Sequence, residues 1–468
     1  MVFLSCNFER RITTMEHTKQ EIQYKRMTET PIPKLIMTLA IPTVISMLVT
    51  AIYNIADTYF VSQLGKSVSG AVSVVFSLMA IIQAAGFTLG MGASSVISRA
   101  LGKKDYKKAN NCASAAFFTA LAVGALIAIS GSIFNQKLMG SLGATDTVLP
   151  YAQEYGKYIL LGAPVMVSSF VLNNVLRAEG KATYSMVGLA FGGILNIVLD
   201  PIFIFKFGMG ISGAAIATLV SQVISFFVLI SAFVLGKSIV KLQPNAIFDY
   251  GATIIETINT GAPSFCRQGL SSISTILLNT QAGIHGGDAA LSAMGIVSKV
   301  FMCIFCIGLG VGQGYQPVAG YNYSSGNYVR LKKAFGFTYM MGTIIMLVLG
   351  GSAFVFAPQI LAFFIDDASV IEIGTRALRF QAITMPLLPI NVVCNMTFQS
   401  LGYKIKAIVL SCCRQGLFFI PCVMILPNLL SLNGVELTQA TADFLTSLVS
   451  IPFAILFIKE INNKISDN

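Results

Sequence analysis

Long apolar runs joined by short polar connections constrain this chain more than any other feature. A membrane-spanning helix needs about 20 predominantly apolar residues, and the sequence offers twelve such segments. The predicted spans are 35–62, 70–98, 112–134, 156–176, 184–205, 211–235, 253–281, 289–318, 335–356, 376–401, 406–429 and 437–458. The chain is therefore predicted to be an all-α membrane protein with twelve transmembrane helices.

The composition supports this interpretation. Charged residues make up 11% of the 468 residues, hydrophobic residues make up 55%, and the mean hydropathy is +0.75. An average soluble protein carries roughly 25% charged residues, and half that number does not cover a chain of this size with a water-facing surface. The composition excludes a disordered chain, a coiled coil and an ordinary cytosolic enzyme.

The distribution of basic residues predicts the orientation. Lys and Arg outnumber Asp and Glu by 31 to 20, which in a soluble chain suggests nucleic acid, but in a membrane protein marks the cytoplasmic side. With the N-terminus, the even-numbered connections and the C-terminus on one side, few basic residues fall on the other: Lys66, Lys137, Lys157, Lys206, Arg376 and Arg379. Both termini are therefore predicted to be cytoplasmic, in a multi-pass protein of the inner cell membrane with no nucleic-acid partner.

The second half of the chain repeats the first at an offset near 222 residues. The matching pairs are Pro42 with Pro263, Gly90-Met91-Gly92 with Gly310-Val311-Gly312, Lys107-Lys108-Ala109 with Lys332-Lys333-Ala334, Pro164 with Pro386, Gly180 with Gly402, and Pro201 with Pro421. Each half holds six spans, so both enter the membrane from the same side as a parallel repeat. The predicted organisation is a cytoplasmic tail (1–34), an N-lobe (35–235), a cytoplasmic linker (236–252), a C-lobe (253–458) and a second tail (459–468).

Two similar bundles around a central cavity are typical of secondary transporters that alternate access. A primary pump needs the phosphate-binding loop G-x-x-x-x-G-K-[ST]. The nearest matches, Gly65-Lys66-Ser67 and Gly236-Lys237-Ser238, lack the first glycine, because Phe60 and Ser231 stand there. No connection is long enough to hold a nucleotide-binding domain. The sequence predicts transport driven by an ion gradient, or downhill transport.

Two acids in the N-lobe suggest where an ion binds. Asp57 and Asp200 lie near the outer ends of the first and fifth spans, and Thr218 lies at a similar depth in the sixth. Asn196 precedes Asp200 by one helical turn and shares its face. An ionisable residue inside a membrane costs roughly 2.5–3.5 kcal/mol on insertion scales, and neighbouring carboxylates there do not both stay ionised without a cation. The cluster is predicted to bind Na⁺ or H⁺, although each aspartate alone is equally typical of a snorkelling or helix-capping carboxylate.

The charged residues within the C-lobe spans are basic: Arg267, Lys299 and Arg414. We find no acid at comparable depth, and expect these side chains to pair with backbone carbonyls or loop acids. A role with an anionic substrate and a charge relay beside Gln268 are the open alternatives. The glycines Gly308, Gly310, Gly312 and Gly314 predict close helix packing. The lone Cys303-x-x-Cys306 pair inside a span predicts small buried side chains, and no metal site or cofactor is predicted.

These motifs together resemble a known family. The segments that show the resemblance are Leu39-Ala40-Ile41-Pro42, Asn54-x-x-Asp57, Leu64-Gly65, Leu176-Arg177-Ala178-Glu179-Gly180-Lys181, Asn196-x-x-x-Asp200-Pro201 and Gly213-Ala214-Ala215 leading to Thr218. They are similar to segments of the multidrug and toxic compound extrusion (MATE) family, over about residues 30 to 458, and the pattern looks most like its MepA-like bacterial branch.

The resemblance implies a V-shaped antiporter with two lobes of six helices. Such a protein exchanges amphipathic, often cationic drugs for Na⁺ or H⁺, is not an enzyme, needs no cofactor, and works as a monomer in the lipid bilayer. The N-lobe cation site of the family maps onto Asp57, Asn196, Asp200 and Thr218. Two further positions, Tyr155 and Asn173, match residues that line the N-lobe cavity in relatives.

The chain departs from one branch of the family, which carries acids in the seventh and tenth segments. The corresponding segments here offer Arg267 and Gln268, then Gln381 and Asn395. No cation site is therefore predicted in the C-lobe.

Two other functions stay open from the sequence. A flippase for lipid-linked oligosaccharides, from the same wider superfamily, needs a strongly basic cavity, which only the C-lobe bases favour. The Asn-x-x-x-Asp-Pro element argues against it. A membrane-embedded lipid transferase needs polar catalytic clusters on substantial loops. The connections here are short, and none of them holds a cluster of His or other metal ligands.

Overall fold

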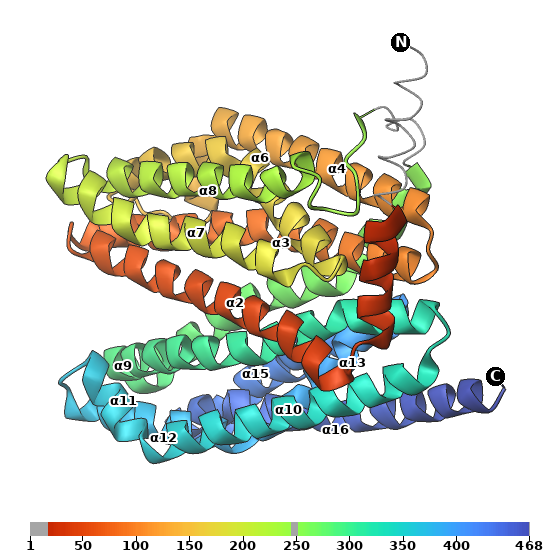
Figure 1. The fold of residues 1–468 in the computed structure, drawn as a ribbon. Helices are drawn as coiled ribbons and strands as arrows, with labels where there is room; N and C mark the ends of the chain where they lie inside the picture. Colours follow the sequence, from red (N-terminus) through yellow and green to blue (C-terminus); the bar gives the residue numbers. More distant parts are fainter. Residues whose placement is uncertain (1–16, 245–250, 468) are drawn as a thin grey trace, which may run out of the picture.

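The computed structural model describes residues 17–244 and 251–467, and these form helices joined by short connections, with no strand among them. Parts of the predicted first tail (1–16), linker (245–250) and second tail (468) lie outside the described residues. The helices form two bundles that lie one above the other in Figure 1, with the first half of the chain above and the second half below. This arrangement confirms the predicted all-α class and its division into two halves.

The first bundle holds the six spans predicted for the N-lobe. Its helices are α2 (Ile32–Ser62), α3 (Lys66–Gly102), α4 (Tyr106–Ile133), the short α5 (Asn135–Ser141), α6 (Leu149–Ala178), α7 (Ala182–Pro201), which continues as the π-helix η1 (Ile202–Lys206), and α8 (Gly210–Val234). The third span was predicted to start at residue 112. It starts at Tyr106 because the Asp105 side chain caps the helix by accepting the backbone N–H of Lys108 at 2.9 Å.

The second bundle holds the remaining spans. Its helices are α9 (Gly251–Ser324), α10 (Tyr328–Val355), α11 (Ala357–Phe364), α12 (Ala368–Thr384), the 3-10 turn η3 (Met385–Leu387), α13 (Leu388–Leu401), α14 (Lys404–Cys412), the π-helix η4 (Cys413–Phe418), α15 (Phe419–Leu430) and α16 (Leu432–Ser466). The tenth predicted span corresponds to α12 through α13, and the eleventh to α14 through α15.

Helix α9 contains two membrane crossings. Its 74 residues would extend about 110 Å as one straight helix, whereas a bilayer core is about 30 Å thick. Gly287 interrupts the helix with φ 61° and ψ −154°, a conformation open to glycine. The predicted spans 253–281 and 289–318 lie on either side of it. Eleven continuous apolar helical runs among the described residues therefore correspond to twelve crossings. The predicted spans imply a loop at residues 282–288 between them. That prediction is wrong, because the helix continues up to the break at Gly287.

Three spans that were predicted as single helices are interrupted. The segments η1, η3 and η4 lie next to Pro201, Pro386 and Pro421, respectively. Proline lacks a backbone N–H and its ring clashes with the carbonyl one turn earlier, so the local hydrogen-bond pattern must change. Pro201 and Pro421 match across the repeat, and both bundles carry a π segment in the fifth helix of their half, directly after Pro201 and three residues before Pro421.

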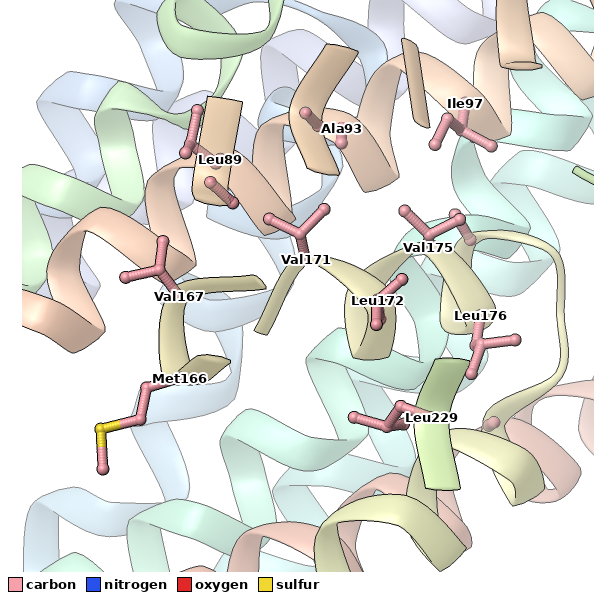
Figure 2. Close-up of a cluster of buried hydrophobic side chains, with 14 of the residues drawn as sticks. Leu89, Ala93, Ile97, Met166, Val167, Val171, Leu172, Val175, Leu176 and Leu229 are labelled. Atoms are coloured by element: carbon pink, nitrogen blue, oxygen red, sulfur yellow. The ribbon is translucent and has the colours of Figure 1, made fainter. Parts of the chain in front are cut away.

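Helix α6 lies at the centre of the first bundle. Figure 2 shows its side chains Val171 and Val175 on the side toward α3, and Leu172 on the side toward Leu229 of α8. All four are fully buried. Helix α6 contacts α3, α4, α7 and α8, so it forms the framework to which the helices of the candidate site are attached.

At several glycines the two bundles touch backbone to backbone. A Cβ atom on Gly92 of α3 would lie 2.0 Å from the Thr257 carbonyl oxygen, and one on Gly261 of α9 would lie 1.8 Å from the Thr88 carbonyl oxygen. Cβ atoms on Gly310 and Gly314 of α9 would lie 2.8 and 2.6 Å from the Cα atoms of Val44 and Ala40 in α2. The close packing predicted for the glycine run is confirmed.

Polar contacts between the bundles gather at the end of the molecule where the C-terminus lies (Figure 1, right). Arg99 of α3 donates to Glu256 at 3.2 Å and to the Ser400 carbonyl at 2.7 Å. Lys108 also pairs with Glu256, at 3.0 Å. We call this end, with Arg99, Lys108, Glu256 and the glycine contacts, the closed end. Toward the opposite end the helices of the two bundles diverge (Figure 1, left).

The predicted polar tail is partly structured. Residues 17–29 form a helix against the closed end. Met27 is fully buried, and the Gln23 side chain, one turn earlier, donates to the Glu179 carbonyl at 2.6 Å. This one-turn spacing places both side chains on a single face, which explains why a mostly polar segment packs on the protein.

Candidate cation site in the first bundle

Five of the six residues predicted for the N-lobe come together from four helices. Asp57 lies on α2, Tyr155 on α6, Asn196 and Asp200 on α7, and Thr218 on α8. Each of these side chains is at least 96% buried. We call this group the first-bundle cluster.

Small residues allow the helices to approach. A Cβ atom on Gly193 of α7 would lie 2.7 Å from a Val49 side-chain carbon on α2. A Cβ atom on Gly213 of α8 would lie 2.7 Å from the Phe203 carbonyl oxygen in η1. Larger side chains at either position would push α2 and α8 away from the turn that carries Asp200.

Hydrogen bonds connect the members of the cluster. The Tyr155 hydroxyl donates to Asp57 Oδ2 at 3.3 Å. The Asn196 amide donates to Asp200 Oδ1 at 3.1 Å and to Thr218 Oγ1 at 3.2 Å. The carboxylates of Asp57 and Asp200 are near enough to interact electrostatically. The equal depths inferred for these residues therefore correspond to direct contacts.

Three buried oxygen atoms of the cluster have no hydrogen-bond partner: Asp57 Oδ1, Asp200 Oδ2 and Asn196 Oδ1. A buried charge that stays without a partner is costly, so buried carboxylates are paired or bind cations. Oxygen is the ligand that hard cations prefer. Two carboxylate oxygens and one amide oxygen, together with Thr218 Oγ1, fit a proton or a small hard monovalent cation. Among the described residues no group of three or more His, Cys, Asp or Glu side chains is placed to hold a metal ion.

Tyr53 is a neighbour that the sequence analysis missed. It lies on α2 one turn before Asp57, is 9% exposed, and is close enough to interact with both aspartates. The signal was the four-residue spacing that places Tyr53 and Asp57 on one helix face. Asn54, singled out from the sequence beside Asp57, instead donates to the Thr50 carbonyl at 2.9 Å.

Asn173 lies apart from the cluster. Its amide donates to the carbonyl and hydroxyl oxygens of Ser185, near the start of α7, while Asp200 lies at the other end of that helix. The contact joins α6 to α7 near the closed end.

The C-lobe expectation that no acid lies at comparable depth is wrong. Asp443 of α16 is fully buried, and Arg414 of η4 donates to it from Nε at 2.7 Å. The α16 helix starts at Leu432, so Asp443 lies about three turns inside it. The sequence placed the start of this span later, at residue 437, which made the same acid look peripheral. Arg414 is thus paired with a membrane-embedded acid and not with a loop acid or a carbonyl.

The other bases differ in their partners. Arg376 pairs with the buried Glu436 at 3.0 Å. Lys299 is exposed. Arg267 is partly buried and makes no hydrogen bond or ion pair with any residue that the structure describes.

Comparison with known proteins identifies the family. The MatE family model matches residues 42–202 and again residues 263–425. The two matches start at Pro42 and Pro263, the first pair of the predicted repeat, which confirms that repeat.

Individual relatives cover nearly the whole chain. The multidrug export protein MepA of Staphylococcus aureus (strain MRSA252) is 28% identical over 431 residues, which cover 90% of this chain and 93% of that protein. A multidrug resistance MATE family transporter of the MOP superfamily, solved in an outward-facing conformation, is 28% identical with a TM-score of 0.89, covering 93% of this chain and 98% of that one. A MOP superfamily transporter from Pyrococcus furiosus Vc1, described as having a binding pocket of reverse polarity, is 29% identical with a TM-score of 0.88, covering 94% and 98%. With a family model that matches both halves of a twelve-crossing membrane protein, the chain belongs to the MatE family of MATE transporters.

Proposed function

We propose that this protein exports amphipathic, mainly cationic compounds in exchange for Na⁺ or H⁺, through alternate opening of its two bundles to the two sides of the membrane. The three unpartnered buried oxygens of Asp57, Asp200 and Asn196 carry the proposal, since they give a driving cation a place to bind. The relatives named as multidrug export proteins support drug-like small molecules as substrates. They favour export over the lipid-linked oligosaccharide flippase and the lipid transferase.

The position of the cluster supports a link between cation binding and helix movement. Its oxygens come from α2, α7 and α8, so a bound cation draws three helices together, whereas the empty site holds two carboxylates that repel each other. Helix α2 also contacts the second bundle, where Ala40 and Val44 pack on Gly314 and Gly310. Movement of α2 at Asp57 therefore reaches the contact between the bundles.

Pro42 gives α2 a place to bend. It lies inside the helix, among the residues that touch α9, and breaks the backbone hydrogen-bond ladder there. We expect the outer half of α2, with Asp57, to change its angle to the inner half when the cation binds. Coupling requires that the two conformations differ in affinity for both ligands.

The described conformation is closed at the end where the helix of residues 17–29 packs. With both termini cytoplasmic, as the basic residues predict, the closed end faces the cytoplasm and the diverging end faces outward. Export then requires that Arg99 and Lys108 release Glu256, so that substrate can enter from the cytoplasm.

Efflux of ethidium from proteoliposomes that contain the purified protein tests the proposal. A Na⁺ gradient and a pH gradient are imposed separately. We expect efflux to follow one of them and to be lost in Asp57→Asn and in Asp200→Asn, because each change removes a carboxylate from the cluster. Asp146→Asn, which removes an exposed carboxylate between α5 and α6, serves as the matched control and should keep wild-type efflux. Unchanged efflux in both cluster variants would contradict the coupling site.

A further inference from the structure

The second bundle contains a small polar pocket that cation coupling does not use. Its polar lining comes from Arg267 of α9, Asn391 and Asn395 of α13, Ser411 of α14, and Arg414 and Gln415 of η4. The pocket volume is about 30 Å³. A water molecule needs at least about 10–15 Å³ of such space, so the pocket has room for one small polar group and not for a drug-sized body.

The charges that face this pocket do not balance. Arg414 is neutralised by Asp443, which also accepts a hydrogen bond from Gln439 at 2.8 Å. Arg267 has no partner among the described residues, and the charge that acts on it is that of Arg414. One guanidinium charge is therefore left uncompensated beside a second guanidinium, which favours an anion in the space between them.

The remaining lining holds donors in fixed positions. The Asn395 amide donates to the Ala407 carbonyl at 2.8 Å and to Ser411 Oγ at 2.7 Å, which leaves the Ser411 hydroxyl hydrogen free to point elsewhere. Arg414 is held by Asp443 and by the Phe305 ring, 4.3 Å from its guanidinium carbon. Its Nε and Nη2 face the Asp443 oxygens at 2.7 and 3.4 Å, so Nη1 is the Arg414 donor left for a second anionic group.

The pocket lies beside the contact between the two bundles. Four of its apolar lining residues are Phe305, Leu309, Val392 and Met396, and these pack against Phe87 and Met91 of α3 in the first bundle. When the bundles separate at the closed end, Phe87 and Met91 must leave this contact. The pocket then opens to the space in which a substrate would lie.

We propose that this pocket binds the anionic group of a zwitterionic or acidic amphiphile, with Arg267 as its main ligand and with the apolar part of that substrate lying between the bundles. The proposal rests on the export function proposed above and adds a second class of substrate to cationic drugs. An anionic lipid head group carries the same chemistry, so the test must separate the two sources.

Two dyes that differ in one group provide the test. Rhodamine 110 carries a free carboxylate, and rhodamine 123 is its methyl ester. Binding of each dye to the purified full-length protein is measured by fluorescence anisotropy in nanodiscs of neutral phosphatidylcholine. We expect Arg267→Gln to weaken rhodamine 110 binding by about tenfold or more, since a charge-assisted hydrogen bond is lost, and to leave rhodamine 123 binding within about twofold. Arg267→Lys should retain part of the affinity because it keeps the charge.

Arg379→Gln is the matched control. Arg379 donates to the Phe354 carbonyl away from the pocket, so this variant should bind both dyes as the wild type does. Equal loss of both dyes in Arg267→Gln, or loss of neither, would overturn the pocket while export of cationic dyes stands. Failure of the wild type to bind either dye would contradict the export function and the pocket together.

Nanodiscs that contain anionic phosphatidylglycerol separate the two sources. Weaker rhodamine 110 binding in these discs, restricted to protein with Arg267, would show lipid head groups competing for the same pocket and would support the site. Competition that persists unchanged in Arg267→Gln would assign the anion to another surface and count against the proposal.

Discussion

Asp57 and Asp443 show how the same chemical group serves different ends in the two bundles. Asp57 keeps one buried oxygen without a partner, as does its neighbour Asp200. Asp443 is paired with Arg414 and with Gln439. The charge of the Asp443 carboxylate is neutralised by Arg414, so it does not attract a cation. The carboxylates of the first-bundle cluster keep their charge for a cation. The repeat thus preserves the helices, while the partners of the buried acids differ between the two bundles.

The buried Arg414–Asp443 ion pair leads to a prediction about the melting temperature of the protein. Removing one member of a buried ion pair leaves an uncompensated charge and costs about 3–5 kcal/mol, whereas replacing both by apolar residues of similar volume is often neutral. We expect Asp443→Leu to lower the melting temperature of the detergent-solubilised protein strongly, and Asp443→Leu with Arg414→Met to recover most of the loss. A double variant as unstable as the single one would show that the pair does more than neutralise charge.

Glu179 explains how the chain between the bundles is held. Its carboxylate accepts the backbone N–H groups of Ile239 and Val240, at 2.8 and 3.4 Å, and the Ser238 hydroxyl. This contact fastens the start of the segment that joins α8 to α9 onto the connection between α6 and α7.

Limited proteolysis tests this attachment. We expect Glu179→Ala to speed tryptic cleavage after Lys237 several-fold, because three donors lose their common acceptor. Glu179→Gln keeps an acceptor oxygen of the same shape and should be cut at a rate between those of Glu179→Ala and the wild type. Equal cleavage rates in all three proteins would mean that other contacts hold this segment.

Most elements could be predicted from the sequence because lipid restricts the choice. A backbone in the bilayer must satisfy its hydrogen bonds within a helix, so an apolar run of sufficient length is enough to identify a span. The start of α4, the break at Gly287 and the π segments depend on a cap, a positive φ and nearby prolines, which act on single residues and not on run averages. Residues Asn196, Asp200 and Thr218 were identifiable from their shared depth and from the one-turn spacing of Asn196 and Asp200. The position of Asn173 and the pairing of Asp443 depend on which helices pack together, and run length does not reveal that.

The two bundles meet through a contact that tolerates no side chain. Since a Cβ atom on Gly261 would overlap the Thr88 carbonyl, the closed end requires glycine there. The Thr88 carbonyl belongs to the backbone, so no change of side-chain rotamer would relieve the overlap. Opening and closing of this end is therefore expected to be sensitive to one position.

Substitution at Gly261 should shift the whole molecule away from the closed conformation. We expect Gly261→Val to lengthen the distance between spin labels at Lys103 and Lys404, two exposed positions near the closed end, and to stop transport while the protein remains folded. Gly269→Val is the matched control, since the space around Gly269 on the same helix is open. The same distance distribution in Gly261→Val and in the wild type would contradict this account of closure.

Reciprocal flux in proteoliposomes tests the central claim, that the first-bundle cluster couples cation and substrate movement. Linkage between two ligands acts in both directions, so an ethidium gradient alone should drive Na⁺ or H⁺ the opposite way. We predict cation flux that starts with the ethidium gradient in the wild type, and none in Asp57→Asn or Asp200→Asn, although both variants still bind ethidium. Cation flux of wild-type size in those variants, or ethidium movement without any cation flux in the wild type, would contradict it.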